Sequence, residues 1–210
     1  MNITGTEKFM SMVSDHINNH HKNAFFSYTD NNKEALLSKF YNGRNVFITG
    51  ITGFKGTWLA LILQQLGANV DGLGLEPDTE SLCNIMDIKN IDGITYSIKN
   101  LQDIKNTNDA KTLITNNPDV ILHLAAQPIV SEGYRDPFYT YNVNIMGTVA
   151  MHEAARALDK KVSFVNVTTD KVYAEGNAPR DENDRLQGFD PYSLSKSCSD
   201  MISQSYANAF

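Results

Sequence analysis

The stretch from Asn45 to Gly56 constrains the fold of this 210-residue chain more than any other. The β-favouring residues 46–49 lead into three glycines spaced Gly-x-x-Gly-x-x-Gly, namely Gly50, Gly53 and Gly56. Apolar residues then recur at helical spacing, which predicts a strand, a tight turn and a helix. Glycine lets a backbone turn sharply and approach a ligand, and the start of a helix offers free N–H groups to a pyrophosphate. A glycine triplet alone could also be an ordinary loop, but the flanking strand and helix favour a nucleotide site.

Strand-like and helix-like stretches alternate along the chain after Asn45. We expect strands at 45–49, 68–75, 94–98, 120–124 and 162–167, and helices at 54–67, 77–91 (weak), 109–115 and 137–158. This alternation predicts an α/β fold, in which helices cover both faces of a doubly wound parallel sheet in a Rossmann-like, three-layer arrangement. The dinucleotide-binding domain is expected at 44–210. Residues 1–43 are expected to form an amino-terminal extension with short helices at 1–22 and 35–41.

The composition argues against several classes of function. The chain has 18 basic and 24 acidic residues, and no dense basic face, which argues against a nucleic-acid partner. Its apolar runs are too short to span a membrane. Cys83 and Cys198 make no disulfide framework and no signal peptide is evident, so a cytoplasmic protein is expected. The adjacent His20 and His21 lack further ligands at suitable spacing, so we expect no metal site.

Candidate cofactor contacts follow the predicted strands, whose carboxyl ends share one edge of a parallel sheet. Glu76 comes directly after the second strand, where a carboxylate can accept hydrogen bonds from the adenosine ribose; this favours NAD over NADP. The alternative is a surface carboxylate at a strand end. Ala125 and Ala126 follow the strand at 120–124, and such small side chains leave room for a cofactor against the backbone.

Two groups of residues indicate acid–base chemistry. Thr169, Asp170 and Lys171 follow the last strand, at the sheet edge where ligands bind. Tyr192 and Lys196 are four residues apart, and so lie about one turn apart on one face of a helix. An ammonium group near a phenol favours the phenolate, which allows the tyrosine to act as a base near neutral pH. The Tyr-x-x-x-Lys pattern is common by chance but becomes specific downstream of a glycine motif.

Together these motifs resemble the extended short-chain dehydrogenase/reductases. Within that superfamily they are most similar to the nucleotide-sugar 4,6-dehydratases, in particular the CDP-glucose 4,6-dehydratase family. The matching segments are Thr-Gly-Phe-Lys-Gly at 52–56, His-Leu-Ala-Ala-Gln-Pro at 123–128, Asn-Ile-Met-Gly-Thr at 144–148, Thr-Asp-Lys at 169–171 and Gly-Phe-Asp-Pro-Tyr-Ser at 188–193. The resemblance runs from about Phe40 to Phe210. In the family, further strands and most of the sugar-nucleotide site follow this point, so we expect weak or no dehydratase activity from this chain alone.

The resemblance implies an NAD site and a reaction. The implied cofactor contacts are Gly50, Thr52, Gly53, Phe54, Lys55, Gly56, Glu76, Ile98, Leu124, Ala125, Ala126, Gln127, Tyr192 and Lys196. The implied substrate is CDP-glucose, which is oxidised at C4, loses water across C5 and C6 and receives the hydride back at C6, giving CDP-4-keto-6-deoxyglucose. The family also implies a homodimer, packed through the helix around Asn144 and the helix that carries Tyr192.

The resemblance also implies a role for each catalytic candidate. Tyr192 would take the proton from the C4 hydroxyl, Lys196 would hold the nicotinamide ribose, and Thr169 would hydrogen-bond the reacting hydroxyl. Asp170 would protonate the departing C6 hydroxyl. Lys171, where many other 4,6-dehydratases carry glutamate, would remove the C5 proton. Asn144 is left with two interpretations, a catalytic one and a structural one in which it bonds the backbone near Thr169.

The sequence departs from the family at several positions. Ser97 and Asn100 are uncharged where members usually carry acidic residues near the adenine. Ser131 and Gly133 stand where arginine and serine are usual beside the sugar, and the 174–180 segment is shorter than the tryptophan-containing loop of CDP-glucose dehydratases.

Two alternatives therefore stay open. One is a nucleotide-sugar epimerase or decarboxylase of the same superfamily, against which the Asp170–Lys171 pair argues, because an epimerase eliminates no water. The other is a non-catalytic NAD-binding module.

Overall fold

The computed structural model of the chain describes residues 31–176 and 179–210. Its sheet contains β1 (Asn45–Thr49), β2 (Asn69–Gly74), β3 (Ser97–Ile98), β4 (Val120–His123) and β5 (Ser163–Asn166), in the order β3-β2-β1-β4-β5. Every neighbouring pair is parallel. The order runs outward in both directions from β1, so the winding reverses between β1 and β4. The predicted doubly wound α/β fold is confirmed.

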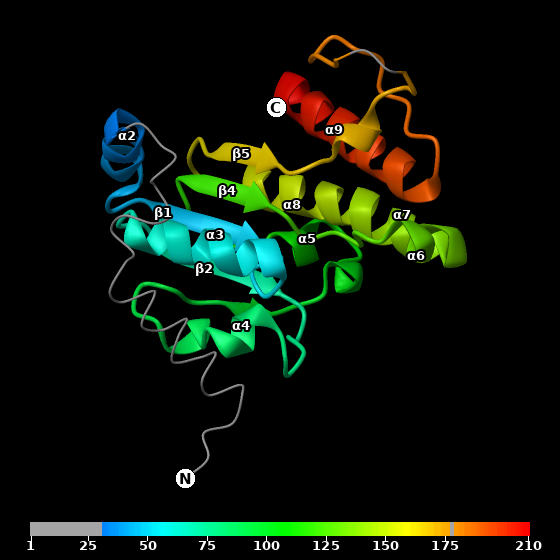
Figure 1. The fold of residues 1–210 in the computed structure, drawn as a ribbon. Coiled ribbons are helices and arrows are strands. Elements are labelled where there is room, and N and C mark those ends of the chain that lie inside the picture. The colour runs from blue at the N-terminus through cyan, green and yellow to red at the C-terminus, as the bar shows by residue number, and fades with distance from the viewer. Residues whose placement is uncertain (1–30, 177–178) are drawn as a thin grey trace.

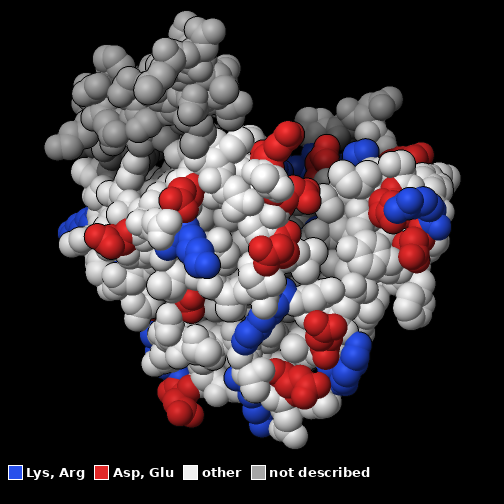
Figure 2. Space-filling model, turned by 90° about the horizontal axis from the view of Figure 1, so that it is seen from below, with Lys and Arg blue, Asp and Glu red and all other residues white. Residues whose placement is uncertain are grey.

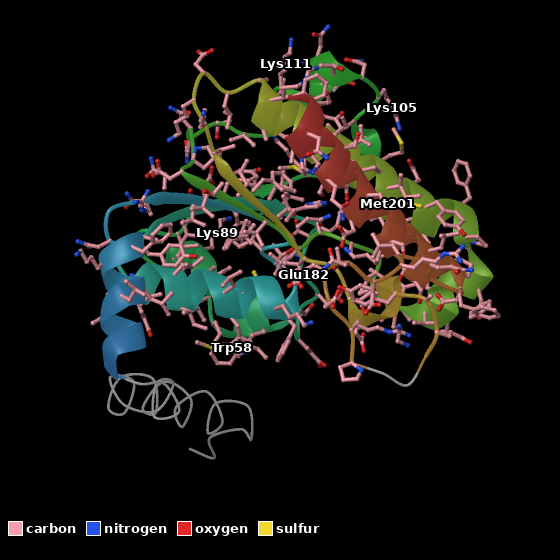
Figure 3. The ribbon with its side chains drawn as sticks, turned by 90° about the horizontal axis from the view of Figure 1, so that it is seen from above. Trp58, Lys89, Lys105, Lys111, Glu182 and Met201 are labelled. Atoms are coloured by element: carbon pink, nitrogen blue, oxygen red, sulfur yellow. The ribbon has the colours of Figure 1, made fainter. Side chains whose placement is uncertain are left out.

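Helices cover both faces of this sheet (Figure 1). The helices of the described residues are α2 (Asn31–Tyr41), α3 (Phe54–Gln65), α4 (Leu82–Ile85), α5 (Thr107–Ala110), α6 (Val130–Arg135), α7 (Pro137–Tyr141), α8 (Gly147–Arg156) and α9 (Pro191–Ala209). A π-helical turn, η3 (Asn142–Met146), joins α7 to α8, and short 3-10 turns lie at η1 (Ile88–Asn90), η2 (Leu101–Asp103) and η4 (Asp170–Val172). Figure 3 shows α9, which bears Met201, lying along α8. Helix α3, which bears Trp58, lies on the opposite side of the sheet.

Alternation of side chains along the strands creates two apolar cores. On one face, Val46 and Ile48 of β1 pack with Leu63 of α3. On the other face, Phe47 packs with Ile121 of β4 and with residues of α8. The sheet is therefore held between two helical layers, and its carboxyl edge is left for the loops that carry the candidate site residues.

Some predicted elements differ from the observed ones. The expected strand at 94–98 is shorter, because only Ser97 and Ile98 continue the ladder with β2 while Ile94 forms a separate bridge. The expected helix at 109–115 is wrong. Its place is taken by the four-residue α5, capped by the side chain of Asn106, and the following chain turns through Asn117 at a φ of 44° just before a proline.

The expected long helix at 137–158 is present as α7, η3 and α8, with the π turn in its middle, and it ends at Arg156. The preceding α6 was not predicted, because six residues are too few to show helical periodicity. The expected helix at 35–41 is confirmed as α2, which begins earlier. The expected helix at 1–22 and the His20–His21 pair lie outside the described residues.

Surface charge, helix length and apolarity, and the grouping of potential metal ligands indicate which kinds of partner the described residues could bind. On the face shown in Figure 2, lysine and arginine side chains are intermixed with aspartate and glutamate, without a continuous basic area. Among residues 31–176 and 179–210, no helix is long and apolar enough to cross a membrane. Within the same ranges, no three His, Cys, Asp or Glu side chains are grouped so that they could hold a metal ion.

Candidate cofactor and catalytic site

The glycine turn between β1 and α3 is built on close backbone contacts. Gly50 has a φ of 71°, a left-handed conformation that favours glycine. A Cβ atom added there would lie 3.0 Å from the backbone nitrogen of Ala125, so the loops after β1 and β4 touch where the winding reverses. At Gly56, an added Cβ would overlap the carbonyl group of Gly50. Both glycines are therefore required, and they draw the start of α3 tightly onto the turn.

Threonine hydroxyls connect this turn to its surroundings. Thr52 donates a hydrogen bond of 2.8 Å to the carbonyl oxygen of Leu75, at the end of β2. This contact holds the segment that carries Glu76 beside the glycine turn, and Glu76 is exposed there. Phe54, the first residue of α3, is 70% exposed, and Ile98, the last residue of β3, is 48% exposed. Of the expected cofactor contacts on this side, Phe54, Glu76 and Ile98 are thus accessible from solvent, whereas Thr52 and Gly56 are buried.

Hydrogen bonds set the tautomer of buried His123 at the end of β4, and burial keeps its ring neutral. The hydroxyl oxygen of Thr49 accepts the backbone N–H groups of Leu124 and Ala125, at 3.1 and 3.0 Å. Its own proton is therefore donated to Nδ1 of His123, 2.7 Å away. The imidazole proton then lies on Nε2, which faces the hydroxyl of Thr148 at 3.3 Å. Burial, with the charge of Lys196 nearby, lowers the pKa of His123 to about 3, so this ring is neutral at physiological pH.

The first turns of α9 place Tyr192 and Lys196. Asp190 caps the helix by accepting the backbone N–H of Ser193 at 3.0 Å, and Pro191 occupies the first helical position, where its missing N–H costs nothing. Lys196 is 3% exposed, and burial lowers the pKa of its ammonium to about 8, while Asp200 opposes the shift. Tyr192 lies one turn earlier on the same helix and is partly exposed.

The turn η4 after β5 carries the other catalytic candidates. Thr169 caps this turn, accepting the N–H of Lys171 at 3.4 Å and donating its hydroxyl proton to Asp170 at 3.1 Å. Asp170 and Lys171 are exposed. The carbonyl of Val172, at the end of η4, accepts the hydroxyl of Ser197 on α9 at 2.8 Å. Through this bond the Thr169–Lys171 segment is attached to the helix that carries Tyr192 and Lys196.

Asn144 does not make the backbone contact near Thr169 that was one of its two interpretations. Its buried side chain contacts the backbone of Gln127 and the hydroxyl of Ser195, rather than the backbone near Thr169. The π turn that carries Asn144 lies against the segment after β4, and the sequence around it showed no sign of this neighbour. Ser195 and Ser197 were also missed, because a serine in a helical pattern is normally interpreted as a surface residue.

The predicted site residues all follow the carboxyl ends of the five strands, or lie on α9 beside them. The glycine turn, Glu76, Ile98, the 124–127 segment and the 169–171 segment meet this edge because the strands are parallel. Asn177 and Ala178, in the shortened segment 174–180, are outside the described residues.

The strand order, the glycine turn at the reversal point and the Tyr-x-x-x-Lys helix define an α/β protein of the short-chain dehydrogenase/reductase type. A family model described as GDP-mannose 4,6 dehydratase matches residues 47–210, and the chain belongs to this family. It is 36% identical to the CDP-glucose 4,6-dehydratase of Salmonella typhimurium over 174 residues, which cover 81% of this chain and 47% of that protein. Identity to a GDP-mannose 4,6-dehydratase of Vibrio cholerae is 26% over 173 residues, covering 80% of this chain and 46% of that protein. The chain thus spans about half the length of these relatives.

Solved structures share the fold at lower identity. An epimerase from Methanothermobacter thermautotrophicus superposes with a TM-score of 0.71 at 22% identity, covering 84% of this chain and 51% of that one. A UDP-glucuronic acid 4-epimerase from Bacillus cereus, solved with UDP-glucuronic acid and NAD, gives a TM-score of 0.66 at 24% identity and covers 79% and 53%. These likenesses confirm the Rossmann-like architecture.

Proposed function

We propose that this chain forms the NAD-binding and catalytic part of a nucleotide-sugar 4,6-dehydratase that acts on CDP-glucose. One observation carries the proposal: the glycine turn touches the end of β4, and buried Lys196 with Tyr192 lies on a helix tied to both the 124–127 and the 169–171 segments. The family membership and the 36% identity to a CDP-glucose 4,6-dehydratase support the reaction and the substrate.

The residues present fit a dinucleotide. The backbone around Gly50 and Gly56 leaves no space for a Cβ atom, which lets the twelve-residue helix α3 direct its first N–H groups at a pyrophosphate. The exposed carboxylate of Glu76, held beside the turn, would accept hydrogen bonds from a ribose diol and repel a 2′-phosphate. This charge favours NAD over NADP. The fold neighbour from Bacillus cereus was solved with NAD.

Tyr192, Lys196 and Thr169 serve the oxidation at C4. When bound, NAD supplies the redox chemistry, accepting a hydride from C4 and returning it to C6. Tyr192 removes the proton of the C4 hydroxyl, and Thr169 orients that hydroxyl by a hydrogen bond. Lys196 is held in place by burial in α9, bonds the nicotinamide ribose and favours the phenolate of Tyr192.

Asp170 and Lys171 serve the elimination. The C4 ketone acidifies the C5–H bond, so Lys171 takes the C5 proton while Asp170 donates a proton to the C6 hydroxyl, which leaves as water. Lys171 then returns its proton to C5. After one cycle Tyr192 has gained a proton and Asp170 has lost one, so a proton must pass from the tyrosine to the aspartate to restore the site. The bond from Ser197 to the carbonyl of Val172 joins the helix that carries Tyr192 to the η4 turn that carries Asp170.

The remaining parts of the proposal concern organisation. We place the NAD-binding domain at residues 44–210, with residues 1–43 as an extension, and we propose a cytoplasmic homodimer. Exposed apolar side chains on α7, η3 and α9, including Phe138, Met146 and Met201, support a dimer through these helices. Sedimentation that shows only monomers would contradict the dimer.

The test is turnover by the 210-residue chain with NAD and CDP-glucose, in which mass spectrometry detects the loss of one water and a 4-keto product. Turnover by this chain alone is expected to be weak at most; what product forms should come from CDP-glucose, with less from GDP-mannose or UDP-glucose and none from the Tyr192→Phe variant. C4-epimerised sugar without loss of water would establish the epimerase alternative instead.

A second candidate is an NAD-binding module without turnover. The observation in its favour is that Ser131 and Gly133 stand where the family usually carries arginine and serine beside the sugar. Tight NAD binding with no product from any of the three sugars would support the module and contradict the dehydratase.

A further inference from the structure

Ser195 lies directly before Lys196 on α9, and it is completely buried. Its hydroxyl connects two parts of the candidate site. The side chain of Asn144 donates to it at 2.8 Å, and the Ser195 hydroxyl donates in turn to the carbonyl oxygen of Tyr192 at 2.6 Å. The bridge therefore begins in the π turn η3 and ends on the residue proposed as the base.

The amide of Asn144 is fully used by these contacts. Its Oδ1 accepts the backbone N–H of Gln127 at 2.7 Å, and its Nδ2 donates to the carbonyl of Gln127 at 3.1 Å and to Ser195. An amide NH2 group has two protons to donate, so Ser195 takes the second one. The orientation of the Asn144 amide therefore depends on an acceptor at position 195, and so do its two hydrogen bonds to the Gln127 backbone.

Gln127 is itself fixed from its other end. Its Nε2 donates to the hydroxyl of Thr140 on α7 at 2.8 Å, and its Oε1 accepts the backbone N–H of Ile129. The segment 124–127, proposed to lie against the cofactor, is thus part of one directional series of bonds: Gln127, Asn144, Ser195, Tyr192. The donors and acceptors of Asn144 are all used in this series, so loss of one bond leaves its partner unpaired.

Helix α6 packs against the first turn of α9 by backbone contact. A Cβ atom added at Gly133 would lie 3.1 Å from the backbone nitrogen of Tyr192, so α6 touches α9 at the residue proposed as the base. Such a contact limits how close the two helices come, but it does not fix the position of Tyr192 along the helix axis. The bond between Ser195 and Asn144 fixes that position at this end of α9, as the bonds of Ser197 to Val172 and of Asn166 to Ser199 do further along the helix.

We infer that Ser195 is a positioning residue, which sets Tyr192 and Lys196 against the cofactor segment 124–127 through Asn144. The inference rests on the proposed function for its consequence, because correct placement matters only if Lys196 and the 124–127 segment bind the same NAD. Ser195 is completely buried, so its hydroxyl acts through Asn144 and the Tyr192 carbonyl.

The first test compares NAD affinity in Ser195→Ala and Ser199→Ala by isothermal titration. Both serines are completely buried on α9, and both substitutions gain the same helix propensity, but the Ser199 hydroxyl bonds Thr148 and Asn166 and neither the Asn144 side chain nor Tyr192. We expect NAD to bind about tenfold more weakly to Ser195→Ala, because a buried donor is left unpaired, and within about twofold of the wild type to Ser199→Ala. Equal affinities of the two variants would overturn the inference.

The second test needs no cofactor, so it also separates this inference from the proposed function. Hydrogen exchange followed by NMR should show about tenfold faster exchange of the Gln127 amide in Ser195→Ala and an unchanged rate in Ser199→Ala. If the wild type binds no NAD, the proposed function fails while this measurement still decides the inference. If Ser195→Ala does not fold, Ser195→Cys keeps the side-chain volume with a weaker acceptor, and the Gln127 amide should again exchange faster. Unchanged exchange in the folded variant would overturn the inference.

Discussion

Helices α3 and α9 both lie on the sheet beside the candidate site, but they are held in opposite ways. The buried residues of α3 are Gly56, Thr57, Ala60 and Leu63, of which Ala60 and Leu63 belong to an apolar cluster and Thr57 bonds the carbonyl of Ile51. The buried residues of α9 are Ser193, Ser195, Lys196, Ser197 and Ser199. One helix is stabilised by the removal of apolar surface from water, and the other by hydroxyl hydrogen bonds.

The difference suits what the two helices are proposed to do. Apolar contacts have no preferred direction and tolerate small shifts, whereas hydrogen bonds fix both distance and angle. The start of α3 needs only backbone N–H groups near a pyrophosphate. Tyr192 and Lys196 on α9 must meet particular atoms, so a directional network holds them. Such a network is costly if one member is lost, because its partners stay buried without bonds.

The largest effect is expected from Asn144→Leu, which keeps the approximate size of the side chain and removes its bonds. The Gln127 N–H and carbonyl and the Ser195 hydroxyl lose a partner, at about 1–3 kcal/mol for each buried group. We expect the total loss of unfolding free energy, measured by urea denaturation, to exceed that of any single truncation in the apolar core. Asn142→Leu, in the same π turn but partly exposed, is the control and should change stability by less than about 0.5 kcal/mol.

The apolar side is tested by Leu63→Ala in α3. Leu63 is 2% exposed, so its truncation should lower the unfolding free energy by about 2–5 kcal/mol. The exposed Leu36 on α2 is the matched control, and its truncation should cost less than about 0.5 kcal/mol. A Leu63→Ala loss larger than that of Asn144→Leu would reverse the comparison between the two helices.

The polar side should also be sensitive to acid. Burial lowers the pKa of His152 to about 4, below its ordinary value near 6.5, and its Nε2 bonds Ser203 on α9. The unfolded chain therefore binds the proton more readily, so the stabilisation is complete above about pH 6.5 and is lost as the pH falls toward 4.

His152→Phe isolates this contribution, because phenylalanine keeps the stacking between Phe164 and Tyr206 and cannot titrate. Thermal unfolding between pH 4.5 and 6.5 should show a smaller loss of stability in the variant than in the wild type. The window stops at 4.5 because the Glu153–Arg156 ion pair, which lowers the pKa of Glu153 to about 2, begins to weaken below it. Equal slopes in the two proteins would rule His152 out as the source.

The smallest effect is expected from Ser197→Ala. Its hydroxyl bonds the carbonyl of Val172 and accepts the N–H of Gly188, and the gain in helix propensity offsets part of the loss. We expect a net cost of about 1 kcal/mol, seen as a small shift of the melting temperature. A cost of several kcal/mol would contradict this expectation, because it exceeds what the loss of one hydroxyl group accounts for.

The same contrast explains how much the sequence could predict. The strand at 45–49, the glycine turn and α3 follow from local signals: apolar periodicity and glycine spacing. Asp190 and Pro191 likewise mark the start of α9 locally. The edge of the sheet where the site residues meet then follows from the parallel arrangement of the strands.

The hydroxyl network could not be predicted, because its bonds join distant positions. Asn144 and Ser195 are 51 residues apart, and Thr49 and His123 are 74 apart. Nothing in a single sequence distinguishes a buried serine from a surface serine. The helix expected at 109–115 failed for another reason, since Asn106 and the Asn117–Pro118 turn restrict α5 to one short turn.

The most direct test of the account is isothermal titration of NAD and NADP into the 210-residue chain, with Gly56→Ala as the comparison. The added methyl group of that variant would overlap the Gly50 carbonyl and open the turn. The account predicts one NAD bound per chain, weaker binding of NADP because of Glu76, and loss of NAD binding in Gly56→Ala. A wild-type chain that binds neither cofactor, or a Gly56→Ala variant that binds NAD as the wild type does, would contradict it.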